Sequence, residues 1–173
     1  MEQKVVTPVQ KGLLISLVLI VFGLAVYFTG QTTNKSLNSI QYILLFGGIV
    51  WSCHYYAKQM NGNVTFGNVF AHGFKTSAFV AALTAVYSFV AVKFLFPDMM
   101  EMGINEARKQ MQSQNNLSEE QIDQALEITR KFFVPIVIGS ILLMFALIGA
   151  IASLVGAGIA KKNPKDPFAQ PLT

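Results

Sequence analysis

Residues 132–160 are the most informative part of this sequence and read FFVPIVIGSILLMFALIGAIASLVGAGIA. None of these 29 residues is charged, and Lys161 and Lys162 follow directly. A helix rises about 1.5 Å per residue and a bilayer core is about 30 Å thick, so about 20 apolar residues suffice to cross it. The stretch therefore predicts a transmembrane helix in an integral membrane protein.

The composition supports this class. Of the 173 residues, 53% are hydrophobic and 13% are charged, about half the charged share of a soluble protein. The length suits a single transmembrane domain over residues 1–173. The net charge of +4 comes from basic residues beside apolar stretches, so we expect no nucleic-acid partner. The single cysteine, Cys53, excludes an internal disulfide and a CxxC site.

The chain contains three further apolar stretches. The four predicted spans are residues 8–29, 40–56, 69–96 and 133–160. The first begins with helix signals, because Thr7 can serve as N-cap, Pro8 as first residue and Gln10 as the partner in a capping box. We therefore predict an all-α fold, a transmembrane four-helix bundle.

The polar segment 97–131 predicts an amphipathic helical hairpin between spans three and four. Its first apolar stripe has helical spacing and consists of Met100, Ile104, Ala107 and Met111. Ser118 and Gln121 form a capping box for the second helix, with Leu117 and Ile122 as a hydrophobic staple. The second stripe consists of Ile122, Ala125, Leu126, Thr129 and Phe133. Pro135 then predicts a kink at the entry to the membrane.

The distribution of lysines predicts the orientation. Four spans put both termini and the turn near residue 60 on one side of the membrane. Seven lysines lie in or beside these short segments: Lys4, Lys11, Lys58, Lys75, Lys161, Lys162 and Lys165. Short cytoplasmic segments carry an excess of basic residues. Both termini, including the tail 161–173, are therefore predicted to be cytoplasmic and the hairpin extracytoplasmic.

Residues 65–77 read TFGNVFAHGFKTS and resemble a family of small bacterial membrane proteins, domain of unknown function 4199, common in Bacteroidetes. The resembling stretch joins spans two and three in that family. The shared identity is concentrated on Phe66, Gly67, Phe70, Gly73, Phe74 and Lys75. The resemblance implies a four-span protein of the inner membrane. It implies no catalytic residue and no cofactor, because the family has no agreed function.

The only two histidines, His54 and His72, are predicted to lie near the cytoplasmic ends of spans two and three. Asn68 and Lys75 lie about one turn on either side of His72. The functional hypothesis is a proton-sensitive or anion-binding site made by His54, Asn68, His72 and Lys75, because polar groups at membrane depth are functional candidates. The simpler interpretation, which we favour, is that these side chains sit at headgroup level. We expect no metal site.

Small residues recur in the last span. Gly149, Ser153 and Ala157 lie four residues apart, and Gly156 belongs to a second such row. Rows of small residues let membrane helices approach closely. They predict either a dimer face or, as we favour, a packing face inside one bundle.

These observations favour a non-enzymatic membrane protein. Its expected partners are the lipid bilayer and either a second copy or another membrane protein. The alternative hypothesis is a small oligomeric transporter or channel that uses the His/Lys site. Against it, the middles of the spans lack the charged residues that ion and proton pathways usually carry.

Overall fold

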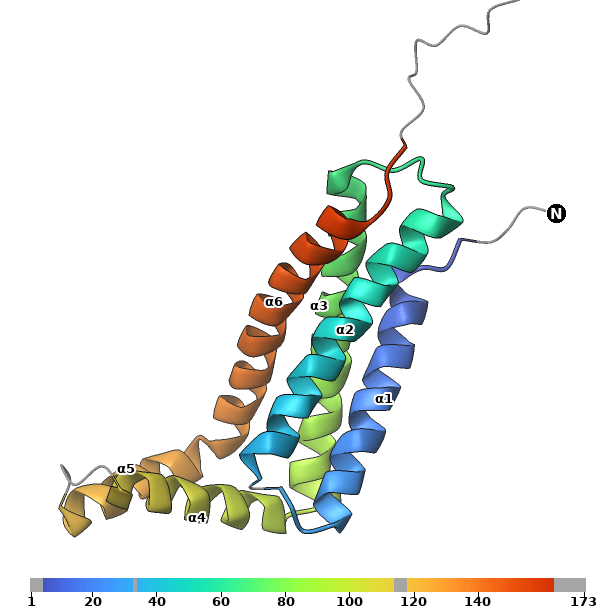
Figure 1. Cartoon of the computed structure of the whole chain (residues 1–173). Helices are drawn as coiled ribbons and strands as arrows, with labels where there is room; N and C mark the ends of the chain where they lie inside the picture. Colours follow the sequence, from blue (N-terminus) through green and yellow to red (C-terminus); the bar gives the residue numbers. More distant parts are fainter. Residues whose placement is uncertain (1–4, 33, 114–117, 164–173) are drawn as a thin grey trace, which may run out of the picture. The chain divides into compact units, whose positions relative to one another are not determined.

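The computed structural model describes residues 5–32, 34–113 and 118–163, and these residues are almost entirely helical (Figure 1). The α-helices are α1 (Pro8–Phe28), α2 (Lys35–Gln59), α3 (Phe66–Val90), α4 (Asp98–Ser113), α5 (Glu119–Lys131) and α6 (Phe133–Ile159). A π-helix, η1 (Ala91–Leu95), extends α3. No strand occurs in the described ranges. The predicted all-α fold is confirmed.

Four helical segments are long and apolar enough to cross a membrane. They are Pro8–Phe28, Ser36–Gln59, Phe66–Leu95 and Phe133–Ile159. Helix α2 extends beyond the predicted span 40–56 at both ends. Its early start follows from capping, because the Asn34 side chain accepts a hydrogen bond of 3.0 Å from the backbone N–H of Ser36. A polar first turn thus precedes the apolar part, which hydropathy alone does not reveal.

Both predicted capping boxes are present. The Thr7 hydroxyl accepts from the backbone N–H of Gln10, and the Gln10 side chain accepts from the backbone N–H of Thr7. Ser118 and Gln121 make the same reciprocal pair at the start of α5. Leu117 of the predicted staple lies outside the described residues, as do residues 164–173 of the predicted tail.

The predicted kink at Pro135 is wrong, because the chain breaks at Phe132, between α5 and α6. Helix α5 ends at Lys131, Phe132 forms its C-cap, and α6 begins at Phe133. A continuous helix would press the Pro135 ring against the carbonyl of Lys131, four residues earlier. In the first turn of α6, by contrast, a proline loses no intrahelical hydrogen bond. The chain therefore breaks before the proline instead of bending at it.

The chain divides into two compact units. Unit 1 comprises Met1–Leu83 and Met144–Thr173, and unit 2 comprises Thr84–Leu143. Unit 1 contains α1, α2, the first part of α3 and the last part of α6. Its almost fully buried side chains include Leu19, Leu45, Ile49, Cys53, Val69 and Val80.

One end of unit 1 gathers three chain segments. The backbone N–H of Val6, just before α1, donates to the Gln59 side chain at the end of α2, at 3.0 Å. The backbone N–H of Asn163, just after α6, donates to the carbonyl of Gly62 in the α2–α3 turn, at 2.7 Å. The start of α1, the α2–α3 turn and the end of α6 therefore lie together.

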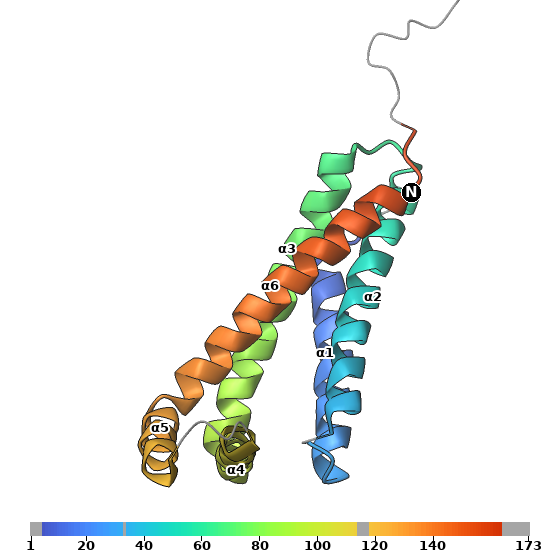
Figure 2. The same ribbon diagram turned by 60° about the vertical axis from the view of Figure 1, so that its left-hand side comes forward.

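In unit 2, α4 and α5 lie side by side, and Figure 2 shows both nearly end-on. The ion pair between the end of α5 and the start of α4 makes the pair antiparallel. Arg130, near the end of α5, donates to both carboxylate oxygens of Glu101, near the start of α4, at 2.5 and 3.1 Å. Arg108 lies 2.5 Å from the Asp123 carboxylate. The buried side chains between the helices are Ile104, Ile122 and Leu126, and Met100, Ala107, Met111 and Phe133 pack against them. Both predicted apolar stripes contribute to this core.

Candidate functional site

His72 is a buried histidine of unit 1 whose side chain has polar partners. Its ring Nε2 lies 3.2 Å from the Ser52 hydroxyl oxygen, and the imidazole stacks on the Tyr56 ring with centroids 4.3 Å apart. Ser52 and Tyr56 are one turn apart on α2, so the same face of α2 supplies both contacts. The side chain of His72 is only 6% exposed.

Thr76, one turn after His72 on α3, completes this polar cluster. Its hydroxyl donates to the backbone carbonyl of His72 at 2.8 Å and lies 3.5 Å from the Ser52 hydroxyl oxygen. We call Ser52, Tyr56, His72 and Thr76 the His72 cluster. Ser52 and Thr76 are fully buried, so the cluster is a hydrogen-bonded polar island inside unit 1.

In the His72 cluster, the Ser52 hydroxyl can donate its proton either to the Thr76 oxygen or to His72 Nε2. Because the Thr76 proton is used on the His72 carbonyl, a bond between the two hydroxyls requires Ser52 to donate. His72 Nε2 must then donate to Ser52. If Ser52 instead donates to Nε2, the Ser52–Thr76 bond is lost. The tautomer of His72 is therefore linked to the orientation of the Ser52 hydroxyl.

The other three residues of the predicted polar site lie elsewhere. Asn68 and Lys75 are exposed on α3, and His54 is exposed on α2. His54 lies two residues from both Ser52 and Tyr56, so it points away from the face that contacts His72. The structure therefore brings His72 together with Ser52, Tyr56 and Thr76 rather than with His54, Asn68 and Lys75.

Sequence reasoning missed Ser52, Tyr56 and Thr76, although a signal for them exists. Thr76 follows His72 by four residues, and Ser52 precedes Tyr56 by four, so each pair shares a helix face. Nothing in these spacings indicates that the two faces meet. That contact depends on how α2 packs against α3.

Lys11 forms a second polar feature of unit 1. Its ammonium nitrogen lies 3.7 Å from the centroid of the Trp51 ring and 3.6 Å from that of the Tyr55 ring. Lys11 is in the second turn of α1, and the two aromatic residues are one turn apart on α2. Two aromatic faces thus surround the cation and compensate for its burial.

The small residues of α6 pack inside unit 1. Gly149, Ser153, Gly156 and Ala157 are all buried. A side chain at Gly149 would collide with Ser77 of α3, and a side chain at Gly156 would meet Cys53 of α2 at 2.7 Å. The Ser77 hydroxyl also donates across to the Phe145 carbonyl of α6 at 3.0 Å. These residues let α6 approach α2 and α3 within one chain.

No group of three or more His, Cys, Asp or Glu residues lies close enough to hold a metal ion within the ranges that the structure describes. The His72 cluster combines an imidazole with buried hydroxyls, which are groups that donate and accept hydrogen bonds.

The family model described as "Protein of unknown function (DUF4199)" matches residues 10–162. The chain belongs to the DUF4199 family. The match runs from the first turn of α1 to the residue before Asn163, so it includes the His72 cluster and both units of this DUF4199 protein. It also confirms the resemblance seen in residues 65–77. No curated protein and no solved structure matches the chain.

Proposed function

We propose that this DUF4199 protein is a multi-pass protein of the bacterial inner membrane that acts by binding another membrane component. The observation that carries the membrane location is that α6 is apolar and yet mostly exposed. An 18-residue window of this helix has a mean hydropathy of 2.6, and only 11% of the window is buried. Leu147, Ile151 and Leu154 are each about half exposed. A helix that is apolar all round requires an apolar surrounding, and lipid supplies one.

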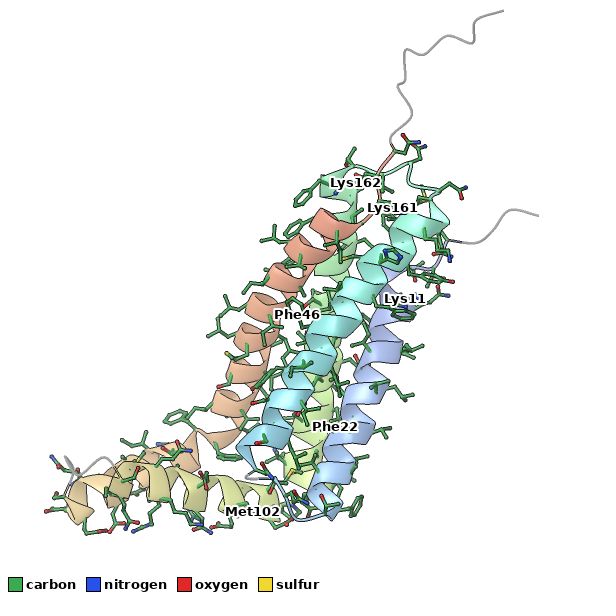
Figure 3. The ribbon with its side chains drawn as sticks, in the orientation of Figure 1. Lys11, Phe22, Phe46, Met102, Lys161 and Lys162 are labelled. Atoms are coloured by element: carbon green, nitrogen blue, oxygen red, sulfur yellow. The ribbon has the colours of Figure 1, made fainter. Side chains whose placement is uncertain are left out.

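The proposed orientation puts the lysine-bearing end of unit 1 in the cytoplasm. Lys11, Lys161 and Lys162 lie toward the same end of unit 1 (Figure 3). Lys58 precedes the α2–α3 turn at that end. The positive-inside rule makes this end cytoplasmic and the α4–α5 pair extracytoplasmic.

Single-cysteine labelling tests the location and the orientation. In a Cys53→Ala background, Lys109→Cys on α4 and Lys161→Cys after α6 each provide one thiol. A membrane-impermeant maleimide added to spheroplasts is expected to label Lys109→Cys at once and Lys161→Cys only after lysis. The opposite pattern would reverse the orientation, and immediate labelling of both would contradict a spanning protein.

The α4–α5 pair supports a binding role. It has its own small core, and ion pairs join its helices toward both ends of the pair. A surface that is already ordered loses little conformational entropy on association. We propose that this pair contacts a membrane-protein partner or a second copy of the chain.

Removing the pair tests the binding role. A variant lacking residues 98–129 and the full-length chain are crosslinked in native membranes, and the sizes of the products are compared. The deletion is expected to abolish the crosslinked species. A matched control is Glu120→Gln with Glu127→Gln, which removes two exposed charges of α5 and keeps the pair. Unchanged products in the deletion would contradict a binding role of α4–α5.

The His72 cluster supports a second candidate, a small oligomeric transporter or channel. Buried imidazole and hydroxyl groups inside a membrane helix bundle are suited to moving a proton. Proton flux into liposomes distinguishes this candidate, with wild type, His72→Ala and His54→Ala compared. Transport predicts flux that His72→Ala abolishes and His54→Ala preserves. The absence of flux in the wild type, or equal flux in all three proteins, would contradict it.

A further inference from the structure

A basic pocket with a volume of about 760 Å³ lies at the end of unit 1 where α2 and α6 finish. Its lining residues are His54, Ala57, Lys58, Asn61, Gly62, Lys161, Lys162 and Asn163. We propose that this pocket binds the phosphate group of an anionic ligand. Its volume falls in the range of about 300–1,000 Å³ that small-molecule sites occupy. We call it the basic pocket.

The backbone of the α2–α3 turn builds the basic pocket. Asn61 and Gly62 have φ angles of 52° and 76°, the left-handed region that ends α2 sharply. The backbone N–H of Asn163 donates to the Gly62 carbonyl at 2.7 Å. A Cβ at Gly62 would lie 3.3 Å from the Asn163 nitrogen. The turn therefore holds the segment after α6 in place and brings Lys161 and Lys162 into one pocket with Lys58.

The charge of the basic pocket has no internal counter-charge in the described part of unit 1. Three lysines and one histidine line it, and no lining residue is acidic. All described acidic residues belong to unit 2: Asp98, Glu101, Glu106, Glu119, Glu120, Asp123 and Glu127. The ion pairs found among the described residues also lie in unit 2. An anion that enters the pocket would therefore meet three lysines and no described acidic side chain.

The three lysines of the basic pocket differ in their contacts within the chain. Lys162 donates to the backbone carbonyl of Ala157 and lies 5.4 Å from the centroid of the Phe66 ring, so it caps the C-terminal end of α6. Lys58 and Lys161 are exposed at the pocket. Their ammonium groups are hydrogen-bond donors suited to phosphate oxygens. His54 and the amides of Asn61 and Asn163 add further donors.

The phosphate has two possible sources. One is the headgroup of an anionic phospholipid, and this form of the proposal rests on the membrane location proposed above. The other is a free phosphate in solution, which does not depend on that location. Amide groups and lysines recognise the phosphate oxygens in both cases, so the experiment has to separate the sources.

Thermal unfolding of the purified full-length protein in detergent tests the proposal, because a ligand that binds the folded state raises the unfolding midpoint. The probes are short-chain phosphatidylglycerol, short-chain phosphatidylcholine, and inorganic phosphate against chloride at equal ionic strength. The variant is Lys58→Gln with Lys161→Gln. The matched control is Lys109→Gln with Lys131→Gln, which removes the same charge from unit 2.

We expect phosphatidylglycerol or inorganic phosphate to raise the midpoint of the wild type and of the control. The half-saturating concentration for the pocket variant should rise about tenfold or more, since two charged hydrogen bonds are lost. A shift with inorganic phosphate assigns a free phosphate, and a shift with phosphatidylglycerol alone assigns a lipid headgroup. Circular dichroism confirms that each variant is folded.

Three results would overturn the proposal. They are no shift with either anion, an equal shift with phosphatidylcholine, and an equal loss of affinity in the pocket variant and the unit 2 control. The labelling experiment above tests the membrane location separately, so failure of the pocket and failure of the location are distinguishable.

Discussion

The ammonium nitrogen of Lys11 lies 3.7 Å from the centroid of the Trp51 ring and thereby joins α1 to α2. The Tyr55 ring, one turn later on α2, faces the same nitrogen at 3.6 Å. A lysine near the start of a first span usually marks orientation. Here it also makes a specific contact between two helices.

Replacing Lys11 by methionine is therefore expected to weaken the packing of α1 on α2. The loss should be about 1–2 kcal/mol for a buried cation over aromatic rings. Trp51 is the only tryptophan, so its fluorescence reports the contact directly. We expect a changed emission spectrum and a lower unfolding midpoint in detergent for Lys11→Met. Lys58→Met, which changes an exposed lysine of α2, serves as control. An unchanged Trp51 spectrum in Lys11→Met would contradict the contact.

Gly149→Ala is expected to destabilise unit 1, because the new methyl group would collide with the Ser77 side chain. Overpacking of this kind costs about 1–3 kcal/mol. Gly158→Ala on the same helix meets nothing within 4 Å, so its better helix propensity should leave stability unchanged or raise it by up to about 1 kcal/mol. Thermal unfolding of both variants measures the difference. Adding Ser77→Gly to Gly149→Ala should restore part of the loss, and equal effects of the two alanines would argue against the close approach.

Ile122→Ala should loosen the α4–α5 pair. Ile122 is 2% exposed in the core of unit 2, and removing a buried isoleucine side chain costs about 2–5 kcal/mol. We expect faster hydrogen exchange of the amides in α4 and α5. Ile128→Ala on the same helix is the matched control, because Ile128 is 62% exposed and should change exchange little. Similar exchange in the two variants would show that Ile122 is not a core residue.

His72→Ala is expected to destabilise unit 1 by about 1–3 kcal/mol, because it removes the partner of a buried hydroxyl and the stack on Tyr56. His54→Ala, on the exposed side of α2, should stay within about 0.5 kcal/mol of the wild type. Chemical unfolding in detergent compares the two. A larger loss of unfolding free energy in His54→Ala than in His72→Ala would contradict the His72 cluster and favour the polar site predicted from the sequence.

Local signals predicted much of the fold. The pairs Thr7 with Gln10 and Ser118 with Gln121 are caps whose geometry involves four consecutive residues, so the sequence indicates them reliably. Hydropathy indicates the four long helices equally well, because it too depends only on residues that are neighbours along the chain. Hydropathy does not reveal the start of α2, because its first turn is polar. The segment 97–131 ends where α5 ends, but the kink expected at Pro135 is a break at Phe132.

The candidate site was less predictable. The residue type alone indicates His72, whereas only their spacing along α3 connects Asn68 and Lys75 with it. Around the axis of α3, Asn68 and Lys75 lie about 40° and 60° to one side of His72. Thr76 lies about 40° to the other side. Thr76 is buried and the other two are exposed, so the buried face of α3 continues from His72 toward Thr76.

The helical class, the four apolar helices, the caps and the family can all be predicted from the sequence, because each depends on residues that are neighbours along the chain. The contact of His72 with Ser52 and the contact of Lys11 with Trp51 follow only from the packing of the helices. These contacts join residues that are 20 and 40 positions apart, and they depend on which faces of α1, α2 and α3 pack together. A face of a helix can be recognised from its own residues, but its partner cannot.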